Sequence, residues 1–136
     1  MREILFRGMR LDNCNWIIGH LIKYEDGRAR ICESHTDIFC YEKDESILQT
    51  VAHMVAPSTI GQFTGLTDKN GKMIFEGDIV QCKDRLEKHL EVFGFIDHKN
   101  GSFVITGDFM THYRWLDYEV EVIGNIHDNH ELFENP

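Results

Sequence analysis

Two Asn-Gly pairs, Asn70-Gly71 and Asn100-Gly101, constrain the fold of this chain more than any other feature of its sequence. Both residues of such a pair tolerate the positive φ angles of a type I′ turn, which joins antiparallel strands by a two-residue connection. Glu25-Asp26-Gly27 predicts a third tight hairpin turn, and Glu76-Gly77-Asp78 predicts a further sharp bend. Because turns at this spacing leave room only for short strands, the sequence predicts a mostly β protein with few short helical turns.

Runs of bulky apolar residues place strands between these turns. The predicted strands lie at residues 3–9, 16–24, 28–33, 37–42, 59–64, 72–75, 78–83, 90–98, 102–106 and 118–126. Residues 46–55 fit a helical stripe and also an alternating strand pattern, and we expect a helical turn followed by a strand at 51–55. The pattern changes near Pro57, which predicts an N-terminal β-rich lobe at 1–57 and a small, closed or nearly closed barrel at 58–136.

Acidic side chains outnumber basic ones by 23 to 14, which gives a formal net charge of −9. The excess lies late in the chain, since residues 1–60 hold 7 basic and 9 acidic side chains whereas residues 61–136 hold 7 and 14. Phosphate backbones are bound by clustered cations, so we expect no direct nucleic-acid binding and no attraction to anionic membranes. No apolar run approaches the roughly 20 residues of a membrane span, and the first residues do not resemble a signal peptide, which predicts a cytoplasmic protein.

Eight His and four Cys make a metal site worth considering. Cys32, His35 and Cys40 have part of the spacing of a zinc knuckle, and His127 and His130 form a second candidate pair. The candidates for a missing fourth ligand of the first group are His20, His53 and Cys82. Since Cys is also a small core residue and surface His is common, we expect neither group to be a native zinc site, and we expect no cofactor.

The sequence holds no nucleophile elbow, P-loop or dinucleotide fingerprint, which predicts a protein without catalytic residues. Four aromatic residues are candidates either for core packing or for an exposed peptide-binding groove. They are Trp16, Tyr113, Trp115 and Tyr118.

Residues 59–80, TIGQFTGLTDKNGKMIFEGDIV, resemble the hallmark block of the YopX family of phage and prophage proteins. ILFRGMR at 4–10, WIIG at 16–19, NGSF at 100–103 and EVIGNI at 121–126 resemble family segments in the same order. The resemblance implies a phage-encoded, mostly β accessory protein of uncharacterised function, whose C-terminal half is an SH3-like barrel. It assigns no catalytic or ligand-binding residue.

The residue types of the hallmark block suit a structural role better than ligand binding, which is the alternative. Glycines permit tight turns and close backbone approach, and Asp carboxylates accept backbone N–H bonds in turns. The residues expected to shape the turns are Gly61, Gly65, Asp68, Asn70, Gly71, Glu76, Gly77 and Asp78. Those expected to fill the barrel interior are Phe63, Leu66, Ile74, Phe75, Ile79 and Val80.

Three classes of function fit these observations. The sequence favours a non-enzymatic module that binds another protein, or a subunit of a homo-oligomer, and the family resemblance implies that it acts in the bacterial host cell. The second class is an acidic protein that inhibits a host nucleic-acid-binding protein by resembling DNA. The third is a metal-binding or enzymatic protein.

Overall fold

The computed structural model describes residues 4–33, 52–84, 91–107, 111–112, 115 and 118–129. The chain divides into two compact units, Met1–Gln62 and Phe63–Pro136, termed the N-terminal and the C-terminal unit. Antiparallel strands dominate the described residues, and a short 3₁₀ turn, η2, lies at Pro57–Thr59. The predicted mostly β class is therefore confirmed.

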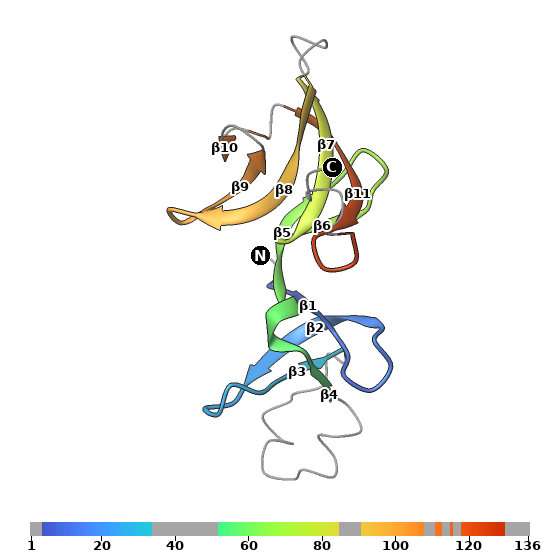
Figure 1. Cartoon of the computed structure of the whole chain (residues 1–136), viewed down its shortest axis with the longest axis vertical. Coiled ribbons are helices and arrows are strands. Elements are labelled where there is room, and N and C mark those ends of the chain that lie inside the picture. Colours follow the sequence, from blue (N-terminus) through green and yellow to red (C-terminus); the bar gives the residue numbers. More distant parts are fainter. Residues whose placement is uncertain are drawn as a thin grey trace. The chain divides into compact units, whose positions relative to one another are not determined.

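The N-terminal unit is built on four strands that are neighbours both in sequence and in the sheet (Figure 1). They are β1 (Phe6–Met9), β2 (Trp16–Lys23), β3 (Ala29–Cys32) and β4 (Ala52–Val55). Beyond β1, Arg10 forms an antiparallel bridge with Val55, so the chain after the first strand returns to the fourth. β5 (Gly61–Thr67) begins on the other side of β1, where Arg7 pairs with Gly61.

The core of the N-terminal unit lies on one face of these strands. Ile17, Ala29, Ile31 and Val55 are buried together, because side chains alternate between the two faces of a strand and these four point the same way. Gly19 permits the close pairing of β2 with β3, since a Cβ at this position would clash with the carbonyl of Cys32.

The C-terminal unit holds a five-stranded antiparallel sheet in the order β10-β9-β8-β7-β11 (Figure 1). These strands are β7 (Asp78–Asp84), β8 (Glu91–Lys99), β9 (Ser102–Gly107), β10 (Thr111–His112) and β11 (Tyr118–Asn125). The later part of β5 forms a hairpin with β6 (Met73–Phe75). Among the described residues the five-stranded sheet is open, with β10 and β11 at its edges, and the SH3-like closure of this lobe stays a prediction.

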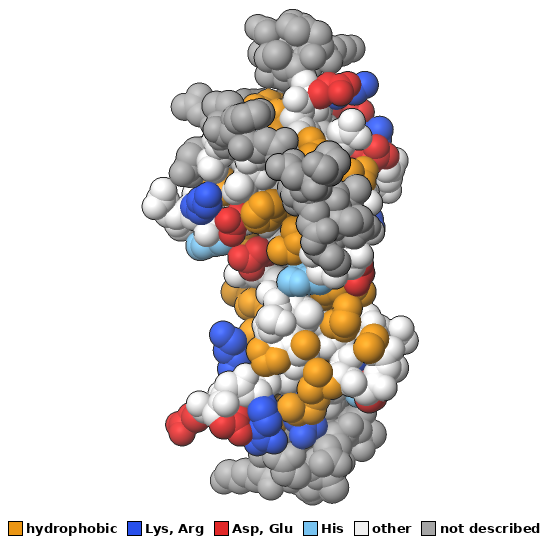
Figure 2. Space-filling model, in the orientation of Figure 1, with side chains coloured by type: hydrophobic (Ala, Val, Ile, Leu, Met, Phe, Trp, Pro, Cys, Tyr) orange, Lys and Arg blue, Asp and Glu red, His pale blue; other side chains and the backbone are white. Residues whose placement is uncertain are grey.

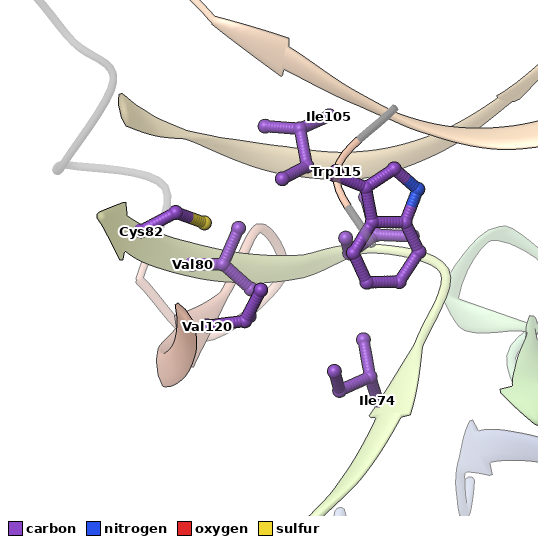
Figure 3. Packing of buried hydrophobic residues seen from close by; sticks show 7 residues of the cluster. Ile74, Val80, Cys82, Ile105, Trp115 and Val120 are labelled. Atoms are coloured by element: carbon purple, nitrogen blue, oxygen red, sulfur yellow. The ribbon is translucent and has the colours of Figure 1, made fainter. Parts of the chain in front are cut away.

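The core of the C-terminal unit takes side chains from the β5–β6 hairpin as well as from the sheet. Its buried members are Ile74, Val80, Cys82, Ile96, Ile105, Trp115 and Val120. Figure 3 shows that the labelled side chains of this cluster extend from several strands into a common interior. The indole N–H of Trp115 donates a hydrogen bond to the carbonyl of Phe103 at 2.8 Å, so the polar atom of this buried ring has a partner.

The residues predicted to fill the interior of this lobe are largely inside. Ile74, Phe75, Ile79 and Val80 are buried, and Leu66 packs against the core cluster. The ring of Phe63 lies 5.5 Å from that of Phe75, centroid to centroid.

The two Asn-Gly pairs form different turns. Asn100 and Gly101 have φ angles of 53° and 80°, as predicted for a type I′ turn, and they connect β8 to β9. In the other pair only Gly71 has a positive φ, 82°. Its N–H donates to the carbonyl of Asp68 at 3.0 Å, which closes a β-turn before the glycine. The predicted type I′ conformation is wrong at residues 70–71, because the Asp68 side chain holds this loop in another form.

The other local predictions have mixed outcomes. Gly27 and Gly77 have φ angles of 94° and 93°, which confirms the tight turns predicted around them. β4 confirms the strand predicted at 51–55 from Ala52 onwards. The strand predicted at 37–42 and the helical turn predicted before residue 51 lie outside the described residues. In the described part of the chain, no helix has the length and apolar character needed to cross a membrane.

Candidate functional site

A cleft of about 220 Å³ opens in the C-terminal unit. Its apolar floor consists of Leu66, Ile74, Trp115 and Val120. Its polar rim consists of Thr67, Asp68, Lys69, Tyr118 and Glu119. The lining therefore combines the end of β5, the loop after it, β6, Trp115 and the start of β11.

The floor of the cleft is one side of the hydrophobic core. Ile74, Trp115 and Val120 are only 1%, 4% and 7% exposed and belong to the core cluster. Because side chains in a packed core have few alternative positions, the floor is rigid and exists before any ligand binds.

Asp68 fixes the loop that forms one wall of the cleft. One oxygen of its carboxylate, Oδ1, accepts hydrogen bonds from the N–H groups of Asn70 and Lys72, each at 2.9 Å. The other, Oδ2, accepts the N–H of Val122 on β11 at 3.0 Å. The N–H of Lys69 also donates to the carbonyl of Val120 at 2.9 Å. The loop thus occupies part of the outer edge of β11, which limits uncontrolled pairing of this edge strand with other chains.

Two opposing effects act on the carboxyl group of Asp68, which is 7% exposed. Burial raises its pKa, while the hydrogen bonds from Val122, Lys72 and Asn70 lower it and prevail, so that the pKa lies below its ordinary value of 3.8. At neutral pH Asp68 is therefore an ionised carboxylate whose acceptor sites are directed at backbone N–H groups.

The rest of the rim presents polar groups to solvent. Lys69 Nζ lies 3.7 Å from a carboxylate oxygen of Glu121, so its charge is partly compensated within the unit. The hydroxyl of Tyr118 is 3.2 Å from Nδ1 of His112, and the two rings pack edge to face. Glu119 is exposed at the start of β11.

The C-terminal unit as a whole is acidic, with 14 Asp and Glu against 7 Lys and Arg in residues 63–136. Figure 2 shows exposed acidic side chains on this unit, several of them beside Lys or Arg. The cleft therefore lies in a unit whose field favours positively charged ligands.

Only some of the candidate metal ligands lie among the described residues. Cys32 is fully buried with Ala52 in the N-terminal unit, where it acts as a core residue. The N–H of His127 donates to Oδ1 of Asn125 in the turn after β11. His35, Cys40 and His130 lie outside the described residues. Within the described ranges, no three side chains of His, Cys, Asp or Glu are grouped so that they could hold a metal ion.

The candidates for a fourth ligand are dispersed. His20 lies opposite Cys32 on the neighbouring strand, whereas His53 lies opposite Ile31 and so belongs to the other face. Cys82 is a member of the C-terminal core, where burial raises the pKa of its thiol to about 12. Its thiol is therefore protonated at neutral pH and is a poor ligand or nucleophile.

The hallmark residues fall into two groups of turns. Asp68, Asn70 and Gly71 form the cleft loop. Gly77 and Asp78 form the β6–β7 turn, in which Oδ2 of the fully buried Asp78 accepts the N–H of Phe75 at 2.7 Å. The remaining members are Gly61 opposite Arg7, Gly65 with a φ of 89° within β5, and the half-buried Glu76.

Of the four aromatic candidates, the structure brings Trp115 and Tyr118 together in the cleft. Trp16 belongs to the N-terminal unit, where the guanidinium of Arg7 lies 5.0 Å from its ring centroid. Tyr113 lies outside the described residues. Four lining residues were not predicted from the sequence, since no local pattern links β11 to the loop after β5. They are Thr67, Lys69, Glu119 and Val120.

Comparison with known proteins gives one family. A family model described as YopX protein matches residues 5–134, nearly the whole chain. A search of curated proteins found no match.

Proposed function

The chain belongs to the YopX family, and we propose that it acts as a non-enzymatic module that binds a segment of another protein in the cleft of its C-terminal unit. The observation that carries this proposal is the cleft itself, whose apolar floor is one side of the packed core (Leu66, Ile74, Trp115 and Val120) and whose rim is polar. Binding sites on proteins concentrate their energy in such pockets, which are filled by one or two anchoring side chains.

The size of the cleft favours a side chain over a metabolite. Small-molecule sites usually measure about 300–1,000 Å³, whereas this cleft measures about 220 Å³. A single large apolar side chain, such as Leu, Phe or Trp, suits a cleft of this size. Tyr118 and Trp115 add the flat aromatic surface that protein interfaces favour.

The charge of the unit indicates what flanks that anchor. Glu119 is exposed on the rim, and Lys69 is already paired with Glu121. The unit carries twice as many acidic as basic side chains. We therefore expect Lys or Arg beside the anchoring residue of the partner, with attraction that speeds association and weakens as salt rises.

The ionisable groups around the cleft support binding rather than catalysis. Asp68 is ionised, and its carboxylate accepts hydrogen bonds from three backbone N–H groups. Its role is therefore to fix the loop. The thiol of Cys82 is packed into the core and has a raised pKa. An activated thiol nucleophile needs a neighbouring base or a lowered pKa, whereas burial raises the pKa of the Cys82 thiol. The acceptor sites of the Asp68 carboxylate are directed at backbone N–H groups.

The proposal also covers the fold of the C-terminal lobe and the origin and location of the protein. The antiparallel order β10-β9-β8-β7 supports an SH3-like barrel in residues 58–136. The family membership supports a phage-encoded accessory protein acting in the cytoplasm of a bacterial host.

A second copy of the chain is the alternative partner. Leu11 and Ile18 on the N-terminal unit support this alternative, because these apolar side chains are 60% and 41% exposed. Gel filtration over a range of concentrations tests it.

The acidic C-terminal unit supports a second candidate function, inhibition of a DNA-binding protein by resembling DNA. Glu119, Glu121 and Asp128 are carboxylates on or next to β11. Such a partner would carry the basic surface that normally meets phosphates. Duplex DNA would then compete with this protein for it, whereas a partner anchored in the cleft need not be displaced by DNA.

A random peptide library, selected on the folded protein, tests the main proposal. We expect the enriched sequences to carry a large apolar residue next to Lys or Arg. A synthetic peptide of the enriched sequence should bind Glu119→Lys at least about tenfold more weakly, a change of about 1.4 kcal/mol. Glu91→Lys is the matched control, because Glu91 and Glu119 both lie opposite Lys83 but Glu91 is not part of the cleft lining.

Affinity for Glu91→Lys should stay within about twofold of wild type, since a rim charge acts mainly at short range. Selection of acidic or wholly polar peptides would contradict the proposal. Equal loss of affinity in both variants would also contradict it, because the effect would then follow net charge and not the cleft.

A further inference from the structure

The strand β11 lies at one edge of the five-stranded sheet, and its first residues also line the cleft (Figure 1). We propose that the partner segment binds as a short extended strand beside β11, with an apolar side chain in the cleft and Lys or Arg directly before or after that residue. This inference rests on the proposed function and adds to it the conformation of the partner segment and the spacing of its side chains.

The outer edge of β11 is covered in part by the loop after β5. Among the described residues, β7 is the strand that pairs with β11, and it does so on one side. On the other side, the N–H of Lys69 donates to the carbonyl of Val120. The N–H of Val122 donates to Asp68. The loop therefore covers the edge from Val120 onwards, whereas the start of β11 borders the cleft. A strand edge of this kind is a template for pairing with an extended peptide.

A main-chain donor of Val120 faces this edge. The N–H and C=O groups of a strand residue point toward the same neighbouring strand, so the N–H of Val120 points away from β7, as its carbonyl does. Within the described part of the chain, no hydrogen bond of this N–H is found. Val120 is 7% exposed, and main-chain donors in such a setting are nearly always satisfied by protein or by ordered water. A carbonyl group of an added strand would supply the acceptor.

The side chains of β11 alternate between the core and the opposite face of the sheet. Val120 belongs to the core cluster, and Tyr118 packs against it. Glu119 lies between them in sequence and therefore faces the other way. A strand added beside β11 would follow the same pleat, so its side chains would alternate in the same manner. One of them would enter the cleft next to Val120, and its two sequence neighbours would lie on the face of Glu119.

The face that carries Glu119 can accept a cation from an added strand. Glu119 lies opposite Lys83 on β7. Lys83 Nζ, however, lies 3.9 Å from a carboxylate oxygen of Glu91 on the strand beyond. Glu119 is exposed, and the described residues contain no ion pair of its carboxylate. Lys or Arg on the added strand would lie directly across from Glu119, where a pair of opposite charges stabilises a sheet.

Two synthetic peptides of equal composition and charge, blocked at both ends, test the spacing. In Thr-Thr-Lys-Phe-Lys-Thr-Thr both lysines adjoin the anchoring Phe, whereas in Thr-Lys-Thr-Phe-Thr-Lys-Thr they stand two positions from it. An extended strand directs the lysines of the first peptide toward the face of Glu119 and those of the second toward the face of the cleft. We expect the first peptide to bind the folded protein about threefold more tightly, as cross-strand charge pairs allow. Titration followed by NMR measures both affinities.

Two variants identify the charge that is responsible. In Glu119→Gln the two peptides should bind equally. Glu91→Gln is the matched control, because Glu91 lies on the same face but on the far side of β7 from β11. This variant should keep the difference between the peptides, since the added strand lies beyond the screening length from Glu91.

Exchange of main-chain amide protons tests the hydrogen bond to Val120. In the free protein we expect the N–H of Val120 to exchange at least about tenfold faster than that of Val122, which donates to Asp68. Saturation with the first peptide should slow the exchange of the Val120 N–H and change that of the Val122 N–H little.

The indole signal of Trp115 separates failure of this inference from failure of the proposed function. Where a peptide shifts that signal, equal affinity of the two peptides or unchanged exchange at Val120 would overturn the added strand and leave the cleft as the binding site. If neither peptide shifts it, the cleft holds no apolar anchor, and the proposed function fails together with this inference. Protection of the Val120 N–H that grows with protein concentration alone would also overturn it, because a second copy of the chain would then occupy the edge.

Discussion

The carboxylate of Asp68 accepts a hydrogen bond from the backbone N–H of Val122, 54 residues later in the chain, at 3.0 Å. The same carboxylate organises its own loop through the N–H groups of Asn70 and Lys72. One side chain therefore connects the β5–β6 hairpin to the edge of the five-stranded sheet by hydrogen bonds. The wall of the cleft depends on these hydrogen bonds.

We expect Asp68→Ala to lower the free energy of unfolding by roughly 3 kcal/mol, because it leaves three backbone donors in a partly buried setting without their acceptor. Denaturant unfolding at neutral pH measures this. Asp26→Ala is the control, since Asp26 also accepts an N–H in a hairpin turn, at 3.0 Å from Arg28, but is exposed. Its effect should be within about 0.5 kcal/mol. Equal losses of unfolding free energy in the two variants would contradict the structural role of the Asp68 hydrogen bonds.

The contribution of Asp68 should depend on pH in one direction. Its pKa is lower in the folded protein than the ordinary value of 3.8, so the folded state favours the ionised form. The stabilisation is complete above the unfolded pKa and is lost as pH falls through the folded pKa, below 3.8. The difference in unfolding free energy between wild type and Asp68→Ala should thus be constant near neutrality and shrink below about pH 4. A difference that grew toward acid would show the opposite sign.

Gly71→Val should destabilise the protein by roughly 1–3 kcal/mol, because a β-branched residue is strained at a φ of 82°. The cause would be backbone strain and not a clash, since a Cβ at this position meets no heavy atom within 4 Å. Thermal and denaturant unfolding measure the effect, and Gly71→Asn, which tolerates this region better, should recover part of it. An unchanged melting temperature would show that the turn is not needed.

Metal content provides a further check. We expect protein purified without added metal to carry well below one equivalent of zinc, and a chelator to leave its melting temperature unchanged. A structural zinc site contributes folding energy directly. A fall of several degrees with chelator would therefore reveal a site that involves Cys32 or His127 together with residues outside the described ranges.

The charge balance predicts that random duplex DNA does not bind at physiological salt. Non-specific binders reach dissociation constants of about 10⁻⁴–10⁻⁶ M under these conditions through clustered cations, and this chain has a net charge of −9. A mobility shift with micromolar protein tests the prediction. Binding would mean that the Lys and Arg side chains of the N-terminal unit form a patch that the net charge conceals.

The sequence by itself determined the mostly β class, the places of the turns and nearly all of the described strands. These properties follow from short-range physics: glycine at a positive φ, alternation of side chains along a strand, and the β preference of Val, Ile and Phe. They hold whether or not distant segments are known. Gly27, Gly77 and the Asn100-Gly101 pair were therefore predictable from their neighbours alone.

The lining of the cleft and the backbone conformation at Asn70 were determined only by the tertiary structure. The cleft unites the loop after β5 with Trp115 and β11, segments that no local pattern connects. Asn70-Gly71 has the same dipeptide sequence as Asn100-Gly101, yet it takes another turn because Asp68 is buried against Val122 and directs its carboxylate at the loop. An ionised group becomes a strong acceptor when a distant strand removes it from water, and that strand is placed by packing of the whole unit.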